Sequence, residues 1–125
     1  MSSYKLSFGT INILQNNLAE VIVDEGVVMD EISVDEYHDF LLNNLEAPMG
    51  LLINKKNSYS YTFEAQKSIV HLDAIKSMAV VTQTSGAVMS TKTLINVNGN
   101  IYRNIKLFQE RENALSWLYK ELSTQ

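Results

Sequence analysis

The 125-residue sequence contains no cysteine and only one proline and one tryptophan. The absence of cysteine excludes disulfide bonds, thiolate zinc sites and cysteine nucleophiles. No apolar run approaches the roughly 20 residues that a membrane-spanning helix needs. The first residues, Met1 to Lys5, include no apolar stretch of the length found in signal peptides. We therefore expect a cytoplasmic protein that does not insert into a membrane.

The sequence also lacks the signatures of common catalytic and cofactor-binding sites. Its five glycines follow neither the GxGxxG nor the GxxxxGK[S/T] order of phosphate-binding loops, and it has no HExxH or GxSxG motif. The two histidines, His38 and His71, are far apart in the chain and are interpreted as surface residues. We predict a protein that is not an enzyme and that has no catalytic residues, no metal ligands and no cofactor.

Positive charge is missing from the first part of the chain. No lysine or arginine lies between Leu6 and Asn54, whereas nine acidic residues do, and residues 55–125 hold nine basic and five acidic residues. An acidic half disfavours nucleic acid as a partner, because phosphate recognition needs clustered basic side chains. The asymmetry either steers a partner or a second copy of the chain, or it reflects a solvated acidic face. Both interpretations stay open.

The remaining composition is that of a globular domain, with 46% hydrophobic and 19% charged residues, and predicts one domain over residues 1–125. Apolar patterning predicts strands at 5–14, 18–23, 50–54, 75–83 and 105–108. The second strand is expected to continue past a bulge or bend at Gly26 to Met29.

Capping residues and helical spacing predict four helices. Ser33 and Glu36 form a capping-box pattern that starts the first helix, and Pro48 marks its exit. The second helix starts at Thr62 and turns Phe63, Ile69 and Val70 toward the core. The third follows 84–86, and the fourth covers 110–122 with Trp117 at the edge of its apolar stripe. The order β-β-α-β-α-β-α-β-α predicts an α/β fold with a mixed four- to five-stranded sheet.

Two short stretches add a family resemblance to this order. The first is Ile53-Asn54-Lys55-Lys56-Asn57-Ser58-Tyr59-Ser60, and the second runs from Lys106-Leu107-Phe108 to Ala114-Leu115-Ser116-Trp117-Leu118. With the predicted order of elements, they resemble the STAS superfamily and its SpoIIAA-like branch of small uncharacterised bacterial proteins. The resemblance implies a non-enzymatic regulatory or protein-interaction module with a protein partner. Self-association as a homodimer is also plausible for a small sheet with an open edge.

The resemblance also gives candidate regulatory residues. In signalling STAS domains, a phosphorylated serine lies in an Asp-Ser-Ser-Gly-like turn after the central strand, and the matching region here contains Ser58 and Ser60. The sequence departs from that turn, since its Asp and Gly are missing and tyrosines flank the serines. The alternative is that both serines only hydrogen-bond the turn and cap a helix.

Two loops are candidate binding sites because each follows a predicted buried strand, where open α/β sheets place ligand clefts. They comprise Asn54, Lys55, Lys56, Asn57, Tyr59 and Tyr61 in one loop, and Thr84, Ser85 and Gly86 in the other. The SpoIIAA-like branch is similar to lipid-binding domains, which implies an alternative function, binding of a small apolar or lipid-like ligand. That alternative predicts an apolar cavity beside the sheet under Tyr59, Tyr61 and Phe63.

Overall fold

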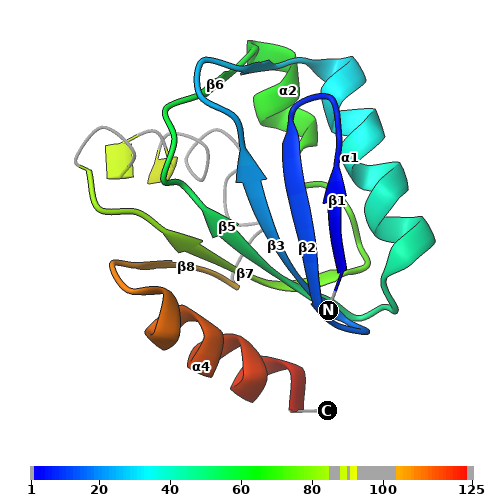
Figure 1. Cartoon of the computed structure of the whole chain (residues 1–125), viewed down its shortest axis with the longest axis vertical. Coiled ribbons are helices and arrows are strands. Elements are labelled where there is room, and N and C mark those ends of the chain that lie inside the picture. Colours follow the sequence, from blue (N-terminus) through cyan, green and yellow to red (C-terminus); the bar gives the residue numbers. More distant parts are fainter. Residues whose placement is uncertain (1, 85–87, 90, 93–103, 124–125) are drawn as a thin grey trace.

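The computed structural model describes residues 2–84, 88–89, 91–92 and 104–123. Six strands within these residues form one sheet in the order β1-β2-β3-β5-β7-β8 (Figure 1). The antiparallel part contains β1 (Ser2–Lys5), β2 (Gly9–Gln15) and β3 (Leu18–Val23). The parallel part continues from β3 through β5 (Met49–Asn54), β7 (Ile75–Val81) and β8 (Ile105–Phe108). A separate two-stranded parallel sheet pairs β4 (Val28–Met29) with β6 (Ser60–Tyr61).

The first predicted strand, 5–14, is wrong because the chain reverses within it. Lys5 pairs with Thr10, and the Leu6 amide donates to the Gly9 carbonyl over 2.7 Å, which closes a tight turn. Gly9 is required where β2 begins, because a Cβ there would lie 2.8 Å from the Val23 Cα and would also collide with the Ile22 carbonyl oxygen. The alternation of apolar residues did not reveal this turn.

The predicted extension of the second strand to Met29 is also wrong. β3 ends at Val23, and Gly26 adopts a φ of 78° in a turn. A side chain is strained at this positive φ, so glycine suits the position. Residues 28–29 then pair with β6 and not with the main sheet.

Helix α1 (Glu31–Asn44) begins two residues before the predicted cap, Ser33. Asp30 is the N-cap, and its Oδ1 accepts from both the amide and the hydroxyl of Ser33. Asp30 satisfies the Ser33 amide, whereas a Ser33 cap would have accepted from the Glu36 amide. Glu36 does not form the predicted capping box. Its carboxylate accepts hydrogen bonds from the amide and the hydroxyl of Ser7, in the β1–β2 turn.

Helix α2 (Phe63–Ser68) begins as predicted, with the Thr62 hydroxyl accepting from the Ala65 amide. Ile69 and Val70 are buried as predicted, but Phe63 is 61% exposed. Its ring packs under the Lys67 ammonium, 4.3 Å from the ring centroid, instead of entering the core. The predicted third helix lies largely outside the described residues.

The two faces of the main sheet hold two separate cores. Helices α1 and α2 cover one face, and α4 (Arg111–Ser123) covers the other (Figure 1). Alternation along β5 sends Leu51 and Ile53 to the first face and Leu52 to the second. Half-buried Trp117 packs on Phe108 at the edge of the α4 core, as predicted. None of the helices within the described residues is long and apolar enough to cross a bilayer.

Candidate functional site

A small cavity lies on the α1–α2 face of the sheet, beside the ends of the parallel strands. Its volume is about 30 Å³, which is room for about two water molecules. Its lining is almost entirely apolar or aromatic: Phe8, Val21, Val23, Met29, Tyr37, Ile53, Lys55, Tyr59, Tyr61, Ile69, Val70, Met78, Val80 and Thr91. We call it the tyrosine cavity, after Tyr37, Tyr59 and Tyr61.

Lys55 is the cation of this lining. The residue is only 7% exposed. Its Nζ lies 4.8 Å from the ring centroid of Tyr59 and 5.3 Å from that of Tyr61. Within the described part of the chain, no carboxylate forms an ion pair with it. Burial lowers the pKa of Lys55 to about 8, so the amine stays mostly protonated at pH 7.

The three tyrosines remain neutral around this lysine. Burial raises the pKa of Tyr61 to about 12, and burial together with the neighbouring phenol of Tyr61 raises the pKa values of Tyr59 and Tyr37 as well. The Tyr61 hydroxyl donates to the Tyr59 hydroxyl over 3.2 Å, and the two rings meet edge to face. The cavity therefore offers uncharged aromatic walls and one buried ammonium.

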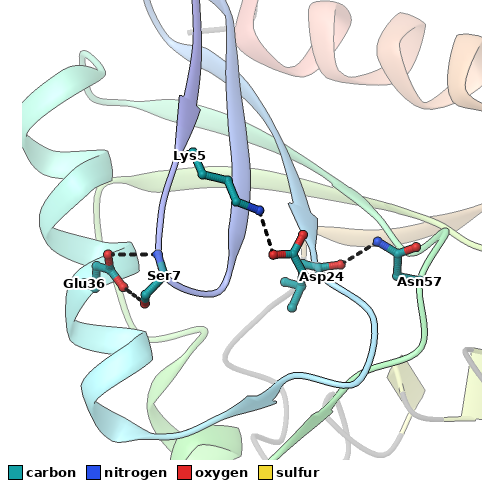
Figure 2. A network of polar contacts seen from close by, with 6 residues as sticks. Lys5, Ser7, Asp24, Glu36 and Asn57 are labelled. Atoms are coloured by element: carbon teal, nitrogen blue, oxygen red, sulfur yellow. Dashed lines mark hydrogen bonds and ion pairs between the residues drawn. The ribbon is translucent and has the colours of Figure 1, made fainter.

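The loop that carries Lys55 and Tyr59 is fastened to the segment after β3. The Asn57 Nδ2 donates to the Val23 carbonyl over 2.9 Å, close to the ion pair of Lys5 with Asp24, whose Nζ–Oδ2 distance is 2.8 Å (Figure 2). The Gly26 amide donates to the Ser58 carbonyl over 2.7 Å. These bonds hold the loop so that Lys55 points inward.

Ser58 and Ser60 are both exposed. The Ser58 amide donates to the Glu25 Oε1 over 3.1 Å, and Ser60 belongs to β6 opposite Val28. Neither is the residue that caps α2, since Thr62 has that role. The prediction that these two serines cap the helix is therefore wrong. The residues directly before Thr62, Ser60 and Tyr61, form strand β6 and pair with β4.

A polar cleft lies on the other side of β5, at the carboxyl ends of β5 and β7. Water-sized spheres can occupy about 280 Å³ of it, and it is lined by Asn54, Lys55, Lys56, Val81, Thr82, Gln83, Thr84 and Arg111. We call it the carboxyl-edge cleft. Lys55 belongs to the linings of both the cleft and the tyrosine cavity.

Arg111, one of the residues that line this cleft, is exposed and forms an ion pair with the buried Glu20. Glu20, only 5% exposed, accepts from the Arg111 Nη2 over 2.9 Å and from its Nε over 3.1 Å. Burial opposes ionisation of Glu20, but hydrogen bonds from Arg111, Asn54 and Asn12 outweigh it and lower its pKa. The expectation of a uniformly solvated acidic face is wrong at Glu20, which supports the Asn54 amide and neutralises Arg111.

The structure divides the predicted binding residues between these two spaces. Lys55, Tyr59 and Tyr61 line the tyrosine cavity, whereas Asn54, Lys56 and Thr84 line the carboxyl-edge cleft. Ser85 and Gly86 lie outside the described residues. Phe63 does not line the cavity, because its ring is exposed.

Several features around the two spaces were not predicted, among them the burial of Lys55, which itself belongs to the predicted loop. Lys55 follows Leu51 and Ile53 at the two-residue period of β5, and this spacing is a sequence signal that its side chain shares their buried face. Arg111 and Glu20 are 91 residues apart in sequence, and nothing local to either indicates the pair. His38 is half-buried and not a surface residue, with its Nε2 2.8 Å from the Ile69 carbonyl oxygen.

No group of three or more metal-ligating side chains occurs among the residues that the structure describes. Neither a family model nor a curated protein matches the sequence. The fold resembles the crystal structure of an uncharacterised protein of the DUF3478 family from Shewanella loihica, which has a SpoIIAA-like fold. The TM-score is 0.58 at 16% identity, over 94% of this chain and 98% of that one. The chain therefore has a SpoIIAA-like α/β fold, as the sequence predicted. The main sheet within the described residues has six strands and not the predicted four to five, because residues 2–5 form an additional edge strand.

Proposed function

We propose that this protein is a non-enzymatic binding protein for a small, mainly apolar ligand that occupies the tyrosine cavity. The observation that supports this proposal is an apolar cavity of about 30 Å³ that is lined by residues of the larger core. Apolar cavities stay dry and take up small apolar molecules, because water inside them lacks hydrogen-bond partners. Ligands larger than the resting space require rearrangement of the tyrosine side chains that line it.

The cavity is tested with a small neutral probe and a matched pair of variants. Val80 lines the cavity, whereas Val81, the next residue of β7, faces the α4 core. Hexanamide should shift the ¹³C-methyl NMR signals of Val21, Val23 and Ile53. Val80→Ile, which adds a methylene to the cavity, should weaken binding at least threefold, and Val81→Ile should not. Unchanged lining methyls, or equal effects of the two variants, would refute the proposal.

A second candidate function, a phosphorylation-controlled protein-interaction module, has its own observation in favour. Ser58 and Ser60 are exposed, and Val28, the register partner of Ser60, is itself 56% exposed. A phosphate on Ser60 would therefore alter an accessible, partly apolar surface. On Ser58 it would face the Glu25 carboxylate, which disfavours it.

This second function predicts phosphate on Ser60 in preference to Ser58. Intact-mass and peptide mass spectrometry of the protein isolated from its own cells should locate a phosphate on Ser60, at an occupancy that changes with growth conditions. The Ser60→Ala variant, expressed in the same cells, should lack it. A chain without phosphate on either serine under every condition would exclude phosphorylation control.

A further inference from the structure

Lys55 is a buried cation for which the described residues provide no carboxylate partner. Lysine is almost never buried to this extent without a carboxylate, yet Lys55 is 7% exposed, and the contacts of its Nζ within the described residues are those with the Tyr59 and Tyr61 rings. The two ion pairs among the described residues use Lys5 and Arg111 instead. Ring contacts offset only part of the loss of hydration.

We infer that the ligand of the tyrosine cavity carries a carboxylate, which pairs with the Lys55 ammonium while its apolar body contacts the aromatic walls. This inference rests on the proposed function and adds the chemical class of the ligand. The amine loses most of its hydration when the protein folds, so an incoming anion meets a site that is already largely dehydrated and oriented. Its attraction to the anion is then stronger than that of an exposed lysine.

The charge of the lining selects a monoanion. Lys55 is the cation among the lining residues, and the titratable groups that face it from the same lining, Tyr37, Tyr59 and Tyr61, are neutral phenols with raised pKa values. One ammonium balances one carboxylate. A dianionic phosphate would leave an unpaired buried charge, which is strongly unfavourable.

The position of Lys55 between the tyrosine cavity and the carboxyl-edge cleft determines how the ligand is oriented. Because Lys55 lines both the cavity and the carboxyl-edge cleft, the carboxylate end lies toward the cleft, which also contains Lys56 and Arg111. Arg111 is already neutralised by Glu20, and Lys56 is exposed. Lys55 is therefore the cation that distinguishes acidic from neutral ligands.

The test compares two probes of nearly equal shape, hexanoate and hexanamide, on the full chain. At pH 7 hexanoate should bind at least tenfold more tightly than hexanamide by NMR titration. Lys55→Met should abolish that preference while hexanamide still binds, and Lys56→Met, a matched change at the next residue, should keep it. Bound hexanoate should also raise the pKa of Lys55, measured from its ¹³Cε shift, above about 8.

Each outcome separates this inference from the proposed function. If hexanamide binds in the cavity as well as hexanoate does, the carboxylate inference fails while the proposed function stands. If neither probe moves the lining methyls, the proposed function fails. A preference for hexanoate that disappears in Lys56→Met and survives in Lys55→Met would place the acid in the cleft and overturn the inference.

Discussion

Replacing Lys55 with methionine is expected to stabilise the protein at pH 7 by on the order of 3 kcal/mol. Burial holds the pKa of the amine at about 8 in the folded protein, against 10.5 in its ordinary state. Each unit of pKa difference corresponds to about 1.4 kcal/mol of differential interaction. Methionine has a similar length and no charge, so it removes that cost without leaving a void.

The pH dependence of this effect has a definite sign. The folded-state pKa lies below the unfolded one, so the unfolded chain binds more protons between pH 8 and 10.5. The cost of Lys55 is complete below pH 8 and disappears as the pH rises through that window. The stability difference between wild type and Lys55→Met should therefore shrink toward zero near pH 10.5.

Urea unfolding followed by circular dichroism at pH 7, 8.5 and 10 measures this difference. Lys56→Met, at the exposed neighbouring lysine, should change the free energy of unfolding by less than about 0.5 kcal/mol. Destabilisation by Lys55→Met at pH 7, or a gain that is the same at all three pH values, would contradict the environment described for this lysine.

Replacing Leu118 with alanine should destabilise the protein by about 3 kcal/mol, within the range for fully buried leucines. Leu118 is completely buried in the smaller core on the α4 face, with Leu18, Leu52, Ala79, Val81 and Ala114. It lies against β5 at Gly50, where an added Cβ would be 3.4 Å from the Leu118 Cδ2. Within the described residues of α4, Leu118 is the one large side chain that is buried, whereas Leu115, Trp117 and Leu122 are only partly buried beside it.

Denaturant unfolding measures the loss of unfolding free energy in Leu118→Ala, and amide hydrogen exchange shows which elements are destabilised. Exchange in Leu118→Ala should accelerate in α4 more than in β2 and β3, because the larger core on the opposite face is untouched. Lys120→Ala, two residues further along the same helix and exposed, is the control and should be nearly neutral. Equal acceleration throughout the sheet would show that the two cores do not separate in this way.

The parts of the fold that the sequence predicted are those with a continuous apolar run or a strong helical period. β5 and β8 lie where the buried runs indicated, and α4 begins within one residue of its expected start. The β1–β2 turn was missed because Leu6 and Phe8 continue the apolar alternation through it, and the turn-favouring Ser7 and Gly9 are separated by Phe8. The close approach of Gly9 to β3 is a tertiary contact, and the pattern of apolar residues along the chain does not predict it.

The candidate site was predicted in part for the same reason. The polar loop after β5 was identified from its position at a strand end, but the prediction did not distinguish its two neighbouring lysines, Lys55 and Lys56. The structure buries Lys55 and exposes Lys56, because alternation along β5 continues one residue past its end. The ion pair of Glu20 with Arg111 depends on the docking of α4, a tertiary contact that no local pattern encodes.

The two-residue pairing of β4 with β6 has a kinetic consequence. Met29 and Tyr61 are register partners in this small sheet, and both line the tyrosine cavity. Segments held by few backbone hydrogen bonds separate at a small fraction of the free energy of global unfolding. The wall of the cavity at β4–β6 can thus open many times in the lifetime of the folded state, so the exchange of a ligand is decoupled from the slow unfolding of the six-stranded sheet.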